Sequence, residues 1–228
     1  MNDQLLKMKE ALQFIEDQGG FLRVNTSGPD GNEKIQSIVF TTAKQLADIE
    51  RDGSATDVCL LDLTYGCCSE KYKTAAIVYP CPRTGGTRIA CTALLVDETS
   101  LTMEQFLTQF KTILQPKFFF VDKDFGQLEV LNRFFPTSRV LLCAFHVIKY
   151  IANLFATMHS TRHRDMILVK KNLFQLFKRM VNSYNQVQFD ESWSEFRSKG
   201  LHCTVRSGKS VVPLIDYLEK NWISCVEM

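Results

Sequence analysis

The stretch Val58-Cys59-Leu60-Leu61-Asp62-Leu63-Thr64-Tyr65 is an apolar run that a single carboxylate interrupts. A continuous apolar run of this length, in contrast to an alternating one, is typical of a strand that is buried on both faces of a sheet. Burying a lone carboxylate is unfavourable unless it has a partner, a metal ion or solvent. The run therefore predicts a central strand, and Asp62 is its first candidate functional residue.

Strand-like runs and helical periods follow this stretch. Short turns around Pro80, Pro82 and Gly85-Gly86 separate the next strands, and such short connections favour an antiparallel meander. From Met103 onward, apolar residues recur with helical spacing. We expect strands at 58–65, 74–79, 87–96, 117–122 and 139–143, and helices at 103–114, 127–135, 145–158, 165–182, 189–198 and 211–222.

The segment before residue 57 has a pattern of its own. Apolar residues over 3–16 have helical spacing that ends at Gly19-Gly20, and a turn cluster at 27–32 separates two strand-like runs, 21–25 and 34–41. This pattern predicts a helix, a hairpin and then a short helix over 43–52.

The order of the elements indicates the fold class. Each of the last two strands follows a helix, so each should run parallel to a neighbour through a right-handed crossover. We predict an α/β fold: an RNase H-like mixed five-stranded sheet of three antiparallel strands and two βα units. The expected parts are an N-terminal helix and hairpin lobe (1–56), this core (57–146), and a basic α-helical insert with truncated C-terminal helices (147–228).

Asp62 and Asp122 each interrupt or end an apolar strand. In an RNase H-like sheet the first and fourth strands are neighbours, so the two carboxylates would lie side by side. Carboxylates that close repel one another unless a divalent cation lies between them, and this arrangement serves metal-dependent phosphoryl transfer. The alternative is structural: Asp62 would cap a strand end, and Asp122 would begin a turn.

Composition limits the class of protein. The 228 residues are 45% hydrophobic and 23% charged, which is ordinary for a globular chain of one domain, with or without a small lobe. Residues 1–114 hold 11 basic and 15 acidic side chains, and residues 115–228 hold 16 and 10. A polyanion would therefore bind the second half, although unevenly solvated faces would give the same balance.

Targeting signals and cysteines indicate the compartment. The apolar runs are shorter than the roughly 20 residues of a membrane-spanning helix, and the first residues lack the pattern of a signal peptide. The eight cysteines contain no C-x-x-C pair. We expect reduced thiols in a nuclear or cytoplasmic protein that is neither secreted nor membrane-bound.

Several motifs carry a resemblance to a known family. They are Leu61-Asp62-Leu63-Thr64-Tyr65, Phe120-Val121-Asp122-Lys123-Asp124, Phe134-Phe135-Pro136 and the run from Val140 to Val147. Together they resemble the transposase domain of Mutator-like elements, and most of all its domesticated branch, the SWIM-type zinc-finger proteins with an RNase H-like domain. The resemblance covers residues 57–150 with distinctive motifs and is weaker toward the C-terminus.

The resemblance implies a DDE-type nuclease site. Asp62 would be the first catalytic acid and Asp122 the second, and both would bind Mg²⁺ or Mn²⁺ if the site is functional. The family's third acid lies in a Phe-Glu-x-x-Trp pattern, which here reads Phe189-Asp190-Glu191-Ser192-Trp193. Asp190 replaces the glutamate, and the adjacent Glu191 would substitute for it only if the helix rotated.

Cys143 and His146 match the C-x-x-H signature that follows the fifth strand in these transposases. A zinc site would need two more ligands from His202, Cys203 or Cys225, and their spacing is not that of a zinc finger. The alternative is a small buried side chain at Cys143 and a hydrogen-bonded His146 at the start of a helix.

A basic stretch follows the core. In a helical projection, Lys171, Lys178 and Arg179 lie opposite the apolar face of residues 169–180. A basic face beside a nuclease-like core is where a phosphate backbone would run; the alternative is a solvated face. The candidate nucleic-acid-binding residues are Arg162, Arg164, Lys170, Lys171, Lys178 and Arg179.

Together these features predict a domesticated or truncated RNase H-like domain of a nuclear protein. We expect a DNA- or chromatin-associated or protein-interaction module without catalysis. The alternatives are a DDE-type metal-dependent nuclease or transposase and a zinc-stabilised interaction domain. The sequence contains neither a separate DNA-binding module before the core nor the C-x-C and C-x-H zinc module of SWIM proteins, so we expect a fragment, an isoform or a partial gene product.

Overall fold

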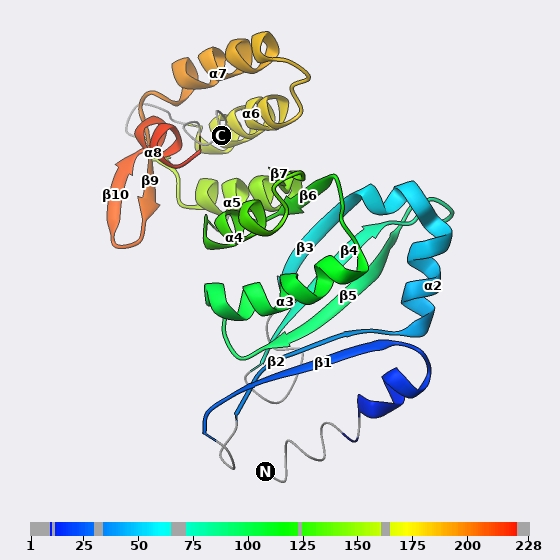
Figure 1. The fold of residues 1–228 in the computed structure, drawn as a ribbon. Helices are drawn as coiled ribbons and strands as arrows, with labels where there is room; N and C mark the ends of the chain where they lie inside the picture. The colour runs from blue at the N-terminus through cyan, green and yellow to red at the C-terminus, as the bar shows by residue number, and fades with distance from the viewer. Residues whose placement is uncertain are drawn as a thin grey trace. The chain divides into compact units, whose positions relative to one another are not determined.

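The chain forms two compact units, residues 1–143 and 144–228 (Figure 1). The structure, a computed structural model, describes residues 10, 12–29, 34–64, 72–122, 125–160 and 165–222. Within the predicted first helix, only residues 10 and 12–16 are described, and they are helical.

A seven-stranded mixed sheet organises the first unit. Its strand order is β1-β2-β5-β4-β3-β6-β7. The pairs β3/β6 and β6/β7 are parallel, and the other pairs are antiparallel. The strands are β1 (Phe21–Ser27), β2 (Lys34–Thr41), β3 (Val58–Thr64), β4 (Lys73–Pro80), β5 (Thr87–Leu95), β6 (Phe118–Val121) and β7 (Arg139–Leu142).

The strands β3 to β7 form the predicted RNase H-like core. β3, β4 and β5 are the antiparallel meander, β6 lies beside β3, and β7 lies beside β6. Helix α3 (Ser100–Ile113) precedes β6, and α4 (Phe125–Phe134) makes the crossover from β6 to β7. The predicted adjacency of the first and fourth core strands is thus confirmed.

The sheet has two strands more than the predicted five, because the N-terminal hairpin joins it. β2 pairs with the outer edge of β5, from Ser37 opposite Leu95 to Phe40 opposite Thr92. Ile38 and Val39 are fully buried in this position. The hairpin therefore buries its apolar run by extending the core sheet, and the domain boundary at residue 56 stays a prediction.

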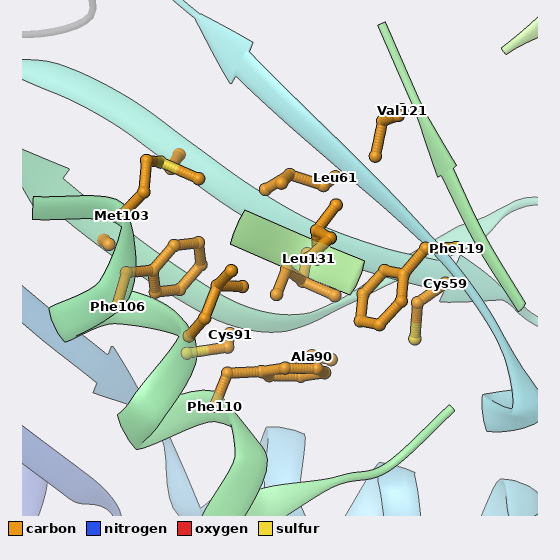
Figure 2. Close-up of a cluster of buried hydrophobic side chains, with 14 of the residues drawn as sticks. Cys59, Leu61, Ala90, Cys91, Met103, Phe106, Phe110, Phe119, Val121 and Leu131 are labelled. Atoms are coloured by element: carbon orange, nitrogen blue, oxygen red, sulfur yellow. The ribbon is translucent and has the colours of Figure 1, made fainter. Parts of the chain in front are cut away.

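A cluster of apolar side chains fills the space between the sheet and its helices (Figure 2). Cys59 and Leu61 of β3 are buried, whereas Leu60 between them is half-buried. The strand is therefore more deeply buried on one face than on the other, in contrast to the predicted burial on both faces. Phe106 and Phe110 of α3 are fully buried in the same cluster, and burying an aromatic side chain stabilises the fold by about 1.5–3 kcal/mol.

Helix α2 (Ala43–Asp52) and the 3₁₀ helix η1 (Gly53–Asp57) connect the hairpin to β3. The helix begins where the sequence predicts it, since Thr42 and Gln45 form a reciprocal capping box. In this motif the side chains satisfy backbone groups that the first helical turn leaves without partners.

The second unit combines helices with a small sheet. Its order is α5 (Ala144–Ala156), β8 (His159–Ser160), α6 (Met166–Val181), α7 (Gln186–Gly200), β9 (Cys203–Ser207), β10 (Ser210–Pro213) and α8 (Leu214–Asn221). Phe155, Phe177 and Phe196 are buried, and the ring of Phe196 lies within 6.3 Å of both other ring centroids. Among the described residues of both units, no helix is long and apolar enough to span a membrane.

The prediction that everything after residue 145 is helical is wrong for β8, β9 and β10, which form a three-stranded sheet. Cys203 and Val205 are buried on alternate positions of β9, and Gly208, with φ of 60°, lies in the turn to β10. Only glycine adopts this left-handed conformation readily. The helix predicted from residue 211 begins instead at Leu214, because residues 210–213 pair with β9.

Candidate functional site

Asp62 and Asp122 follow aligned positions of two adjacent parallel strands. β3 and β6 pair in register, with Leu60 opposite Phe120 and Leu61 opposite Val121. Side chains alternate along a strand, so the next pair in this register, Asp62 and Asp122, belongs to the face opposite Leu61. Neighbouring strands stand about 4.8 Å apart. The two predicted acids are therefore neighbours at the carboxyl-terminal edge of the parallel strands.

The two carboxylates have different surroundings. Asp62 is half-buried, and its Oδ2 accepts a hydrogen bond of 3.1 Å from Thr64 Oγ1. Ala76 of β4 lies opposite Asp62 and brings only a methyl group beside the carboxylate. Asp122 is exposed at the end of β6.

These two residues fit a hard divalent cation. Mg²⁺ usually binds one or two protein carboxylates and completes its shell with water or substrate phosphate oxygens. Among the described residues, no three Asp, Glu, His or Cys side chains form a group that could hold a metal ion. The site thus offers a carboxylate pair, and the catalytic and metal-binding roles of Asp62 and Asp122 stay predictions.

The predicted third acid lies on α7, in the second unit. This helix buries Ser192 and Phe196, whereas Asp190 and Glu191 are exposed. Asp190 Oδ1 accepts a hydrogen bond of 2.8 Å from Gln186 Nε2, one turn earlier on the same helix. Asp190 therefore has a partner within its own helix, and its catalytic role, like that of Glu191, stays a prediction.

Cys143 is the last residue of the first unit, and His146 is near the beginning of the second. Cys143 follows β7, and its amide donates to the Val121 carbonyl at 2.7 Å, which continues the pairing with β6. The thiol is free and half-buried. His146 is in the first turn of α5, with its ring centroid 5.4 Å from that of Phe145.

The further zinc ligands that the sequence suggested come from the second unit. Cys203 is a buried residue of β9, and His202 is exposed before it. Cys225 lies outside the described residues. A zinc role for Cys143 and His146 stays a prediction.

The basic stretch lies on α6, where its cations have partners within the unit. Lys170 Nζ donates to the Ala156 carbonyl at 3.1 Å. Lys178 Nζ lies 4.9 Å from the centroid of the Phe174 ring. Arg179 forms an ion pair of 3.4 Å with Glu195.

Lys171 is exposed on the same helix. Arg162 and Arg164 lie outside the described residues. The nucleic-acid contacts of all these residues stay predictions.

An ionic network that the sequence does not predict lies beside α2. Arg88 of β5 contacts Asp48, and its Nε lies 3.3 Å from Asp52 Oδ2. Arg51 contacts the same two carboxylates, and Tyr79 donates a hydrogen bond of 3.2 Å to Asp52. The spacing of Asp48 and Asp52 puts both on one helix face, but their partner Arg88 is far away in the sequence, so no local signal reveals the network.

Cys81 extends this network with a thiol. Its side chain is only 2% exposed, and Arg88 Nε donates to its Sγ at 3.0 Å. Hydrogen bonds from the side chains of Thr84 and Arg88 lower the pKa of Cys81 to about 6. By contrast, burial raises the pKa of Cys91 to about 12.

We expect the free energy of unfolding to fall as the pH is lowered through about 6, in part because Cys81 is protonated. The pKa of Cys81 is about 6 in the folded protein, below its ordinary value of 9.0. The stabilisation is therefore complete above the unfolded-state pKa and is lost as the pH falls through the folded-state pKa. Urea unfolding at about pH 8 and about pH 5 measures the difference.

The Cys81→Ala variant should show a smaller stability difference between the two pH values than the natural chain. Cys91→Ala is the matched control, because a thiol with a pKa of about 12 stays protonated throughout. The same pH response in the natural chain and in Cys81→Ala would contradict an ionised Cys81.

A family model matches most of the first unit. A profile described as "Zinc finger SWIM domain-containing protein 1/3, RNaseH-like domain" matches residues 13–141, which is more than half of the 228 residues. The matched range includes β1 to β6, with Asp62 and Asp122. A search of curated proteins finds no match.

Comparison with solved structures gives three examples of low similarity. The catalytic core domain of BIV integrase is 10% identical with a TM-score of 0.29, and the alignment covers 75% of this chain and 99% of that one. The Drosophila P element transposase strand transfer complex is 10% identical with a TM-score of 0.33, at 78% and 52% coverage. The simian T-cell lymphotropic virus intasome in complex with PP2A regulatory subunit B56 gamma is 12% identical with a TM-score of 0.31, at 89% and 65% coverage.

Proposed function

This chain belongs to the family of the RNase H-like domain of zinc finger SWIM domain-containing protein 1/3, and we propose that it is a DNA- or chromatin-associated module of a nuclear protein without catalysis of its own. The RNase H-like core supplies the scaffold. The phosphate contacts come from the second unit.

The separation of charge between the two units carries this proposal. Residues 1–143 hold 15 basic and 18 acidic side chains, and residues 144–228 hold 12 and 7. The first unit thus has a net charge of −3 and the second a net charge of +5. A basic excess on one unit attracts a phosphate backbone without reading its sequence.

The third acidic position supports the absence of catalysis. Asp190 is one methylene shorter than the glutamate of the family pattern, and it accepts a hydrogen bond from Gln186. A displacement of about 1 Å in a catalytic constellation can lower the rate about 100-fold. We therefore assign binding, and not strand cleavage, to this domain.

DNA binding by the full chain should be weak, independent of sequence and steeply dependent on salt, because the contacts are to phosphates. A triple variant with alanine at Lys171, Lys178 and Arg179 should depend less steeply on salt. The magnitude of the slope of log affinity against log salt should fall by about 2–3, because each phosphate that is no longer neutralised removes roughly 0.9. Fluorescence anisotropy with two unrelated duplexes measures both properties.

Lys111→Ala with Lys117→Ala, in the first unit, is the matched control and should leave the slope unchanged. An unchanged slope in the triple variant would show that α6 is an ordinary solvated face.

The adjacency of Asp62 and Asp122 favours a second candidate function, a DDE-type metal-dependent nuclease. The two aspartates would hold Mg²⁺ or Mn²⁺, which would supply Lewis-acid polarisation of a phosphate and activation of a water molecule. Both carboxylates would have to remain ionised to bind the ion.

Incubating the full chain with supercoiled plasmid in Mg²⁺ or Mn²⁺ decides between the two functions. We expect no cleavage beyond that of an Asp62→Asn, Asp122→Asn double variant, because the third acid is one methylene shorter than the glutamate of the family pattern and is hydrogen-bonded within its helix. Metal-dependent cleavage that both single substitutions abolish would establish the nuclease instead.

A further inference from the structure

A groove with a volume of about 320 Å³ lies between α5 and α6 in the second unit. Its lining consists of Ala152, Phe155, Ala156, Lys170, Lys171 and Phe174. No carboxylate is among these described lining residues. The groove therefore combines an apolar floor with positive charge.

The floor of the groove suits the close approach of another helix. Ala152 and Ala156 are exposed and lie one turn apart on α5, and the distance between packed helices depends on the size of the side chains at the contact. Phe155 and Phe174 pack edge to face, with ring centroids 6.2 Å apart. This aromatic contact joins the two helices beneath the groove.

An exposed apolar side chain extends this surface along α6. Ile167 is 83% exposed and lies three and four residues before Lys170 and Lys171, so it shares their side of the helix. A large exposed apolar side chain next to an apolar groove is typical of an interaction surface.

Two lysines of α6 are held by contacts within the unit: Lys170, which lines the groove, and Lys178, which lies outside the lining. Lys170 donates to the last carbonyl of α5, that of Ala156. Lys178 lies over the Phe174 ring, where a cation–π contact favours the ammonium group. Lys170 and the exposed Lys171 give the groove its positive charge, and Lys178 adds a cation further along α6.

A phosphate backbone would use the ammonium groups but leave the alanines and Ile167 exposed to water. An amphipathic helix would use both features, because its apolar stripe would cover the floor and its flanking acidic side chains would meet the lysines. We propose that the α5–α6 groove binds an acidic amphipathic helix of a partner protein. This inference goes beyond the DNA association proposed above and does not depend on it.

The probe for this site is a labelled synthetic peptide of about 18 residues, which makes five helical turns. It carries leucine at helical spacing on one face and glutamate on both flanks. Fluorescence anisotropy with the full chain should show saturable binding with a Kd below about 1 mM. A peptide with lysine in place of every glutamate should bind at least about tenfold more weakly, because its charge is no longer complementary.

Ala152→Trp and Ala156→Trp fill the groove without changing its charge. Each should weaken peptide binding at least about tenfold, which is the scale of removing a central side chain of an interface. Lys171→Glu should weaken it about three- to tenfold. Lys209→Glu, in the exposed turn between β9 and β10, is the matched charge control and should bind like the natural chain.

Circular dichroism checks that each variant is folded. A titration with duplex DNA distinguishes the groove from the basic residues that we propose to contact phosphates. We expect the two tryptophan variants to keep their DNA affinity. The inference is overturned if the peptide shows no saturable binding, or if both folded tryptophan variants bind it normally. It is also overturned if these variants lose DNA affinity and not peptide affinity, which would leave the proposed DNA association intact.

Discussion

The in-register parallel pairing of β3 with β6 is the constraint on which the first unit depends. Cys59 and Leu61 of β3 and Phe119 and Val121 of β6 all belong to the buried cluster beneath α3 and α4. A shift of one residue would turn one strand's apolar side chains away from this cluster. The hydrophobic core therefore fixes the register, and the same register makes Asp62 and Asp122 neighbours. The packing of apolar side chains thus determines that Asp62 and Asp122 lie next to each other.

The two units contribute different properties. The first supplies an RNase H-like scaffold with a carboxylate pair at one edge of its sheet. The second supplies the excess of positive charge and the groove between α5 and α6. A scaffold of this class does not by itself determine chemistry, because function depends on the groups at a site. The binding that we propose for the second unit therefore does not require the carboxylate pair to be a working nuclease centre.

Sequence alone predicted the parts of the fold whose signals are local. The apolar run at 58–65 and the strand that ends at Asp122 identified the central strands, and the βα order identified their adjacency. The additional sheet in the second unit was missed because Cys203 and Val205 give only two buried positions on a short strand, too few to distinguish a strand from a helix. The pairing of β2 with β5 was missed because it depends on which strand of the folded sheet has an edge without a neighbour, and the local sequence does not show this.

In the candidate site, too, residues with a local sequence signal could be predicted, and residues that only the tertiary fold brings together could not. Asp62 and Asp122 could be found because each interrupts or ends an apolar strand. Asp48, Cys81 and Arg88 could not, because their network joins three segments that only the fold brings together. Sequence likewise identified α6 as a basic helix, but the contacts of Lys170 and Lys178 depend on tertiary structure.

The most direct test of the account is the register between β3 and β6 in solution. Nuclear Overhauser spectra of the isotope-labelled full chain should show backbone contacts that link Leu60 with Phe120 and Leu61 with Val121. These contacts would place Asp62 beside Asp122 on one face of the sheet. Contacts offset by one residue, such as Leu61 with Phe120, would put the two carboxylates on opposite faces and contradict the account.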